Sequence, residues 1–218
     1  MLNAIKSAVL PARMYFRSRA WDRKLADKQV ELSDTHLEKL RVISCREKML
    51  EELPKNAVVA EIGVAEGEFS REIVDRCQPK ELVLIDVWES VNPQHGSKAM
   101  LKVKDRLAAE IADGTVKMRQ GFSFDVLETF PDNYFDWVYV DAAHDYENVC
   151  RDISLCLQKV KDDGIIAGHD YIRWARGPAR YGVIEAVNEA VIENEMDFLY
   201  LTHEQDQHLS WAIQSKAA

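Results

Sequence analysis

The segment Val59–Ser70 reads VAEIGVAEGEFS and joins an apolar run to a turn that contains glycine. Gly63 permits a tight turn out of the run, and Gly67 lets the backbone approach a ligand where a helix begins. The spacing is Gly-x-x-x-Gly, not the Gly-x-Gly-x-x-Gly that crowds amides around a dinucleotide pyrophosphate. Glu61 and Glu66 add negative charge, which favours a cationic ligand over a diphosphate. An ordinary strand–turn–helix with two convenient glycines is the alternative.

Apolar runs and helical stretches alternate around this turn. The runs are typical of strands buried on both faces and lie at about 57–62, 82–87, 115–119, 135–140 and 164–168. The stretches with helical spacing lie near 68–77, 97–112, 124–130, 145–160 (with Asp152 on its solvent side) and 179–193. Two closing runs, 197–202 and 209–214, lack a long helix between them, which predicts an antiparallel pair. The pattern predicts an α/β fold: a doubly wound, mostly parallel seven-stranded sheet with an antiparallel C-terminal strand.

A helical N-terminal extension is predicted upstream. Thr35-x-x-Glu38 is a capping box that predicts one helix to about Leu53, before Pro54. We expect residues 1–32 to form a basic arm and residues 33–218 a single domain. Residues 1–24 carry five net positive charges in a chain of net charge −9, so the remainder carries about −14. That arm docks on its own domain, stays mobile or touches an anionic surface.

The composition excludes several classes of protein. An acidic body repels phosphate backbones, so nucleic acid is not expected as a partner. No run of 18 apolar residues is present, so no membrane span is expected, and the N-terminus lacks a secretory signal. The cysteines lack CxxC spacing and are typical of free thiols in a reducing cytoplasm: Cys45, Cys77, Cys150 and Cys156. The oligomeric state stays open, with a homodimer as one alternative.

The second apolar run ends in Asp86, about 20 residues beyond the glycine turn. A carboxylate at this place can accept hydrogen bonds from both ribose hydroxyls of a nucleoside. A solvated loop acid is the alternative. Trp88 follows soon after, where it either stacks on a cofactor or fills the rim.

With the glycine turn and Asp86 in place, the chain resembles class I methyltransferases from about Val58 onward. The resemblance implies S-adenosyl-L-methionine as cofactor and S-adenosyl-L-homocysteine as product. It implies that Glu61, Gly63 and Ser70 lie near the methionine portion and that Gly121-Phe122-Ser123 flanks the adenine. The complete predicted cofactor set is Glu61, Gly63, Gly67, Ser70, Asp86, Val87, Trp88, Phe122, Ser123 and Asp141.

Acidic residues and histidines follow the fourth and fifth strands. Asp141 and His144 follow one, and His169 and Asp170 follow the other. Neighbouring strands lie about 4.8 Å apart, so the two aspartates open onto one cleft, where they repel unless a proton or cation lies between them. Hard oxygen ligands suit Mg²⁺, or Mn²⁺ if a histidine joins.

This section resembles the macrocin O-methyltransferase-like family and its metal-dependent relatives, including catechol-type O-methyltransferases. The matching features are Asp141-x-x-His144 and His169-Asp170-Tyr171. The resemblance implies that Asp141 and Asp170 hold a metal, with His169 as a ligand or a neighbour, and that His144 is the general base. Catalytic roles are therefore expected for His144 and Asp141.

His144 also stands at the predicted start of a helix, whose positive dipole end disfavours imidazolium. We therefore expect a neutral imidazole at pH 7 that accepts a hydroxyl proton. The alternatives are that Asp141 and Asp145 are helix caps and that His169 is a satisfied buried histidine.

Three arginines follow the fifth strand within a glycine- and proline-bearing segment: Arg173, Arg176 and Arg180. As a substrate loop they would favour an acceptor with a carboxylate or phosphate. Pairing with surface acids is the alternative.

These features predict a metal-assisted O-methyltransferase that acts on a small hydroxylated molecule. A metal-independent O- or N-methyltransferase and a non-catalytic binder of S-adenosylmethionine are the alternatives. A nicotinamide-dependent oxidoreductase is disfavoured by the glycine spacing.

Overall fold

The computed structural model describes residue 25 and residues 30–88, 93–174, 180–204 and 208–216. The basic arm predicted over residues 1–32 lies almost entirely outside this part of the chain. The described strands are β1 (Arg41–Ile43), β2 (Val58–Ile62), β3 (Glu81–Asp86), β4 (Val116–Gln120), β5 (Phe135–Val140), β6 (Val160–Gly168), β7 (Met196–Thr202) and β8 (Trp211–Ser215). The described helices are α2 (Asp34–Leu37), α3 (Arg46–Glu52), α4 (Glu68–Cys77), α5 (Pro93–Arg106), α6 (Ala108–Ala112), α7 (Ser123–Leu127), α8 (Tyr146–Lys159) and α9 (Val183–Glu193).

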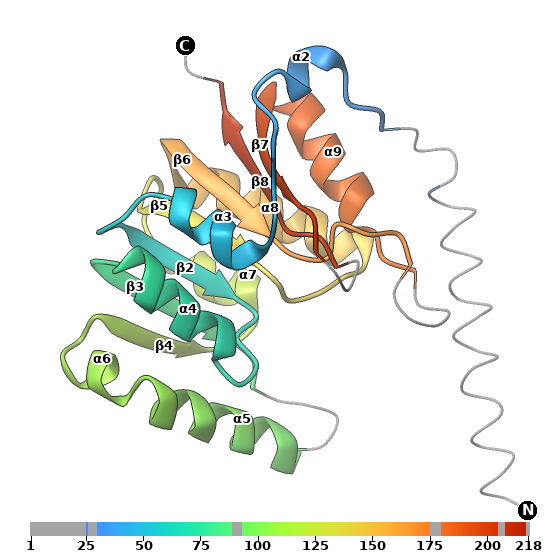
Figure 1. The fold of residues 1–218 in the computed structure, drawn as a ribbon. Coiled ribbons are helices and arrows are strands. Elements are labelled where there is room, and N and C mark those ends of the chain that lie inside the picture. The colour runs from blue at the N-terminus through green and yellow to red at the C-terminus, as the bar shows by residue number, and fades with distance from the viewer. Residues whose placement is uncertain (1–24, 26–29, 89–92, 175–179, 205–207, 217–218) are drawn as a thin grey trace, which may run out of the picture.

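The strands form one eight-stranded sheet in the order β1-β7-β8-β6-β5-β2-β3-β4 (Figure 1). Strand β8 is antiparallel to both of its neighbours, β6 and β7, and all other pairs are parallel. The mostly parallel sheet with an antiparallel C-terminal strand is therefore confirmed. The sheet has one strand more than the seven predicted, because β1 adds to the edge of β7.

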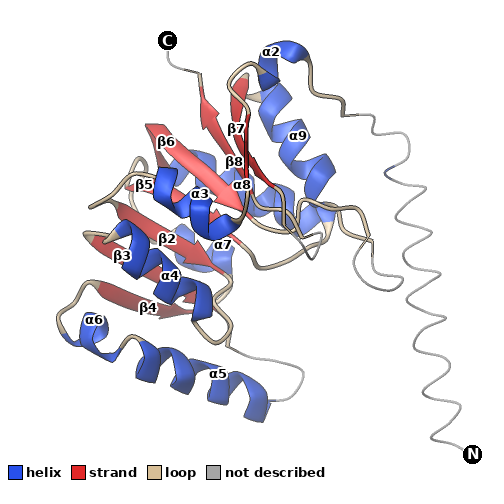
Figure 2. Ribbon diagram, viewed as in Figure 1, coloured by secondary structure: helices blue, strands red, loops and turns tan. Residues whose placement is uncertain are grey.

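Helices cover both faces of the sheet, with α3 and α4 on the near face and α8 on the far face in Figure 2. Alternate residues of β2 show why. Ala60 and Ile62 pack with residues of α7, α8 and α9, whereas Val59 packs with residues of α3, α4 and α5. Successive side chains of a strand point to opposite faces, so a strand buried on both faces reads as a continuous apolar run.

The helix predicted from Thr35 to Leu53 is wrong. The chain forms α2 instead, then β1, and then α3. The N-cap of α2 is Ser33 rather than Thr35. Strand β1 pairs in parallel with β7, and the N–H of His203 donates to the carbonyl of Ile43 at 2.7 Å. This pairing with a distant segment outweighs the local helical spacing.

The remaining helices lie close to their predicted positions, with one break. The stretch predicted as one helix over 97–112 is divided into α5 and α6 at Leu107, whose backbone leaves the helical conformation (φ −118°, ψ 27°). Within the described ranges, no helix is both long and apolar enough to cross a membrane. The four cysteines are free thiols, as predicted.

Candidate active site

A cavity of about 780 Å³ opens at the carboxyl ends of the central strands. This volume lies within the range of small-molecule sites. Its walls come from the segments that follow β2, β3, β4, β5 and β6, together with Arg46 at the start of α3. The chain runs outward from β2 through β3 to β4 and then returns to β5 on the other side of β2. The cavity therefore lies at the point where the strand order reverses, as expected for an open α/β sheet.

The glycine turn after β2 packs directly on the loop after β5. Gly63 has a left-handed backbone (φ +88°), and its N–H donates to the Ile85 carbonyl at 2.9 Å. A side chain on Gly63 would collide with the backbone carbonyl of Asp141. The Asp141 N–H in turn donates to the carbonyl of Ile62 at 2.7 Å. The two loops that were predicted to carry cofactor and catalytic residues are therefore in direct backbone contact.

Gly67 serves helix packing rather than the cavity wall. It caps α4 with a left-handed backbone (φ +75°), and an added Cβ would lie 3.1 Å from Cγ2 of Val103 on α5. Gly67 was predicted to contact a cofactor, but in the structure its role is to fix where α4 begins.

Asp86 joins two of the loops around the cavity. Its Oδ2 accepts the N–H groups of Val64 (2.8 Å) and Ala65 (3.0 Å), and its Oδ1 accepts that of Trp88 (2.7 Å). Asp86 and Val87 both line the cavity. Trp88 is buried, and its Nε1 donates to the Ala65 carbonyl at 3.2 Å, so its ring fills the rim instead of facing the cavity.

One end of the cavity is charged. Glu61 is 1% exposed and accepts a 2.5 Å hydrogen bond from the Ser70 hydroxyl. Burial raises the pKa of Glu61 to about 8. Arg46 lies nearby with its guanidinium 4.6 Å from the centre of the Phe69 ring. The sequence did not reveal Arg46 as a cavity residue, because the predicted helix over 35–53 placed it in mid-helix.

The other end is aromatic. Phe122 is 58% exposed and stacks on Phe124, with ring centres 5.3 Å apart. The hydroxyl of Ser123 donates a 2.5 Å hydrogen bond to Asp152, which α8 places against the cavity. Asp152 is buried, contrary to its predicted position on the solvent side of the helix, and burial raises its pKa. Helix α8 thus supplies a second cavity residue, Asn148, that sequence reasoning missed.

Asp141, His144 and Asp170 form a compact group with one ligand atom from each within 4.8 Å of the others. His144 Nε2 lies 2.7 Å from Asp170 Oδ2 and 3.9 Å from Asp141 Oδ1. The His144 ring stacks on Tyr181, with centres 4.5 Å apart. His208 Nδ1 contacts the second oxygen of Asp170. The predicted clustering of acids and histidine after β5 and β6 is therefore present.

The pKa of His144 is shifted in the opposite direction to that predicted. Burial alone would lower its pKa, but the carboxylates of Asp141 and Asp170 raise it to about 9. The same contacts hold the pKa of Asp170 at about 2, although burial opposes this. The helix cap is Asp145, whose Oδ1 accepts the N–H of Asn148 at 3.2 Å. His144 thus precedes the helix, and two nearby full charges outweigh a helix dipole.

His169 does not belong to the compact group. Its Nδ1 is hydrogen-bonded to the hydroxyl of Ser210 at 2.8 Å, and burial lowers its pKa. Its predicted role as a metal ligand is therefore not supported by its position, whereas His144 completes the group.

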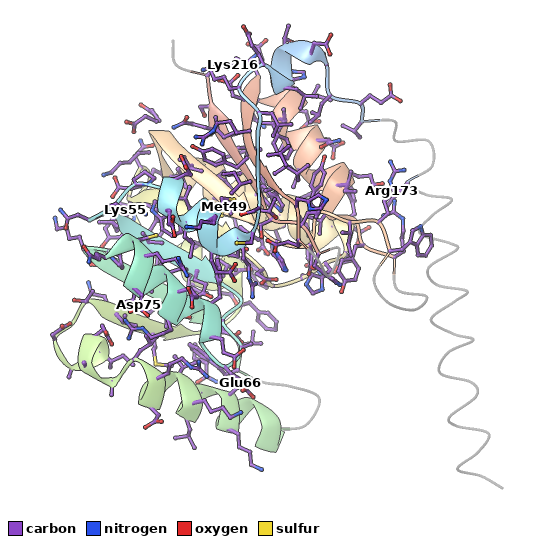
Figure 3. The ribbon with its side chains drawn as sticks, in the orientation of Figure 1. Met49, Lys55, Glu66, Asp75, Arg173 and Lys216 are labelled. Atoms are coloured by element: carbon purple, nitrogen blue, oxygen red, sulfur yellow. The ribbon has the colours of Figure 1, made fainter. Side chains whose placement is uncertain are left out.

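The arginine segment after β6 does not converge on the cavity. The Arg173 guanidinium lies 3.5 Å from Glu185 Oε1, and its side chain is 63% exposed at the periphery of the molecule (Figure 3). The Arg180 side chain is only 4% exposed and is ion-paired with the buried Glu185. Both arginines therefore follow the alternative of pairing with an acid. Arg176 lies outside the described residues.

Three of the seven described non-glycine residues with a left-handed backbone stand beside the site. Ala65, Trp88 and Asp170 have φ angles of +48°, +42° and +59°. Each such residue costs about 1–3 kcal/mol and persists only where its surroundings enforce it. These residues stand in the three segments that follow β2, β3 and β6.

Comparisons with known proteins agree on one kind of fold. A family model described as a methyltransferase domain matches residues 60–171, about half of the chain. An rRNA methylase from Streptococcus thermophilus is 13% identical, with a TM-score of 0.57 over 79% of this chain and 95% of that chain. The pyocyanin biosynthetic protein PhzM is 12% identical, with a TM-score of 0.57 over 77% of this chain and 54% of that chain. The chain thus spans about half the length of PhzM.

A Streptococcus mutans protein titled as a methyltransferase, solved in complex with S-adenosylhomocysteine, is 13% identical. Its TM-score is 0.56 over 78% of this chain and 96% of that chain. At such identities the likeness shows the fold alone. No functionally curated protein is similar enough in sequence to match this chain.

Proposed function

The chain belongs to the methyltransferase-domain family and is an S-adenosylmethionine-dependent methyltransferase. From this premise we propose that it methylates a hydroxyl group of a small molecule with the help of a divalent cation. The observation that carries the proposal is the meeting of the glycine turn, Asp86 and the Asp141–His144–Asp170 group at one cavity.

The charge of the cavity supports a cationic cofactor and a small acceptor. Seven of the described residues that line it are acids: Glu61, Glu66, Glu68, Asp86, Asp141, Asp152 and Asp170. The ionised acids of this wall attract a sulfonium and repel a polyanion such as nucleic acid. The aromatic end around Phe122 and Phe124 fits a flat purine, and the charged end around Glu61 fits an amino-acid group. Asp86 lies between them at the position suited to ribose.

The donor set of the compact group fits a hard divalent cation. Asp141 and Asp170 would hold it through carboxylate oxygens, which suit Mg²⁺ or Mn²⁺, and leave His144 beside it as a base. When bound, the cation would lower the pKa of an acceptor hydroxyl.

The residues of the chain then have two tasks. S-adenosylmethionine supplies a methyl group on a sulfonium, so its leaving group needs no proton. The cavity aligns the two reactants, which is worth about 7–11 kcal/mol in well-oriented reactions. His144 would accept the hydroxyl proton as a neutral imidazole, a form that a cation held by Asp141 and Asp170 would favour by offsetting their stabilisation of the imidazolium.

Calorimetric titration tests cofactor and cation together. S-adenosylmethionine is expected to bind the wild-type protein, and Mn²⁺ or Mg²⁺ is expected to bind and to need Asp170. Asp170→Asn should abolish cation binding, whereas Asp162→Asn, which changes an exposed acid on β6, should leave it unchanged. Equal cation binding by the two variants would remove the metal from the proposal.

The alternatives predict different outcomes once an acceptor is found. A metal-independent O- or N-methyltransferase keeps its activity in EDTA and loses it in His144→Ala. A non-catalytic binding protein binds S-adenosylmethionine tightly and forms no product with any acceptor.

A further inference from the structure

Arg46 enters the cavity from α3, outside the segment matched by the methyltransferase family model. Its side chain is 31% exposed, and its Nη1 lies 4.0 Å from Asp141 Oδ2. The guanidinium packs over the ring of Phe69, in the first turn of α4. Although burial opposes its charge, the neighbouring Tyr139 and Asp141 raise the pKa of Arg46 above its ordinary value.

Arg46 is the only lysine or arginine among the described residues that line the cavity. A direct bidentate arginine–carboxylate pair has N···O distances of about 2.7–2.9 Å. The 4.0 Å separation from Asp141 is much longer, so this pair does not use the forked geometry of the guanidinium. A planar carboxylate of a ligand is the group that matches that geometry best.

The methionine portion of the cofactor carries an ammonium and a carboxylate on one carbon atom. Glu61, whose pKa is raised to about 8 by burial, would release its proton beside the ammonium, whereas a carboxylate that enters this acidic cavity needs a cation close by. Arg46 stands at the same end of the cavity as Glu61, next to the turn that opens α4. We propose that Arg46 binds the α-carboxylate of the cofactor's methionine portion and so sets the position of the sulfonium.

This inference rests on the proposed cofactor site and assigns Arg46 to the recognition of one group, the α-carboxylate. It excludes a purely structural role, in which a change of Arg46 would weaken every ligand alike. It also excludes a role in binding the acceptor alone, in which cofactor affinity would not change.

The test uses two ligands that differ only in this carboxylate: S-adenosylhomocysteine and its decarboxylated analogue. Calorimetry of the full chain should show wild-type protein binding the decarboxylated analogue at least about 10-fold more weakly. Arg46→Gln should weaken S-adenosylhomocysteine by about 10- to 100-fold and change the analogue by less than about 3-fold. Arg41→Gln removes an exposed arginine paired with Glu52 and serves as the control, with no change for either ligand.

Three results would overturn the inference: no discrimination by the wild type, an equal loss for both ligands in Arg46→Gln, or no loss in that variant. If Arg46→Gln does not fold, the wild-type comparison still overturns the inference when the two ligands bind equally well. Failure of the wild type to bind S-adenosylhomocysteine at all would instead overturn the proposed cofactor site.

Discussion

Glu61 illustrates at the residue scale how a ligand site costs stability. Its pKa is raised by burial from 4.5 to about 8, so the folded state keeps a proton that the unfolded state releases. The free energy of unfolding therefore falls as pH rises from about 4.5 to about 8. We expect Glu61→Gln, which still accepts the Ser70 hydrogen bond, to be more stable than wild type by on the order of 3 kcal/mol at pH 7.

Thermal denaturation of the ligand-free protein at pH 5, 7 and 8.5 measures this effect. The difference in free energy of unfolding between the variant and wild type should increase with pH and vanish near pH 4.5. The variant should also bind S-adenosylmethionine less tightly. A gap that does not depend on pH would show that Glu61 is ionised in the folded protein.

Individual residues were predicted with mixed success, and the reason is physical. Asp86, Asp141 and Asp170 were placed correctly because the ends of parallel strands fix where such side chains gather. The pKa of His144 is raised instead of lowered, because it depends on a 2.7 Å contact between loops 26 residues apart in sequence. Arg180 was assigned to substrate because its partner, the buried Glu185, sits on a helix with no sequence signal for that pairing.

At the scale of elements, the turn after β2 depends on the absence of a side chain at Gly63. Gly63→Ala would combine a left-handed backbone with a collision against the Asp141 carbonyl. Gly114 has almost the same backbone (φ +87°) but open space around it, which makes it a matched control. We expect Gly114→Ala to cost about 1 kcal/mol and Gly63→Ala on the order of 3 kcal/mol, with loss of cofactor binding. Urea denaturation measures both, and equal costs would show that the turn does not rest on Asp141.

Asp136 ties the starts of three strands together on the edge of the sheet opposite the cavity. Its carboxylate accepts the N–H of Val58 at 2.6 Å and Nζ of Lys161 at 2.5 Å. Burial alone would raise the pKa of Asp136, but these two hydrogen bonds lower it below 3.8. Its contribution to stability is therefore present above pH 3.8 and is lost as pH falls through the lowered pKa.

We expect Asp136→Asn to lower the free energy of unfolding by about 1–2 kcal/mol at pH 7 and to match wild type in strong acid. Asp75→Asn removes a surface partner of Arg71 (Figure 3) and should change stability by less than about 0.5 kcal/mol. Chemical denaturation at pH 7 and pH 2.5 separates these cases, and a deficit that persists in acid would mean packing, not charge, is responsible.

The elements themselves were predictable wherever both faces of a strand are buried. Most of the runs that became β2 to β8 are short, apolar and bounded by turn residues, which favours strands over helices. The elements over residues 35–53 could not be predicted, because the spacing of Leu37, Leu40 and Ile43 fits one helix as well as it fits α2 followed by β1. The free edge of β7 decided between them, and that edge is formed by residues about 160 positions away.

At the scale of the whole molecule, the cofactor should stabilise the folded chain. S-adenosylhomocysteine at 100 times its dissociation constant adds about 2.7 kcal/mol, which raises the Tm of a chain of this size by about 5–10 °C. NAD should leave the Tm unchanged, because the turn at Gly63 is lined by acids instead of crowded amides. A larger shift with NAD would restore the oxidoreductase alternative. Differential scanning fluorimetry with both ligands measures this.

The close contact of Gly63 with the Asp141 carbonyl limits which residues can be changed by design. The loops after β2 and β5 contact each other through their backbones, so an insertion or a bulkier residue in either loop would disturb both. Changes made to alter acceptor specificity should therefore leave residues 63–67 and 141–144 as they are.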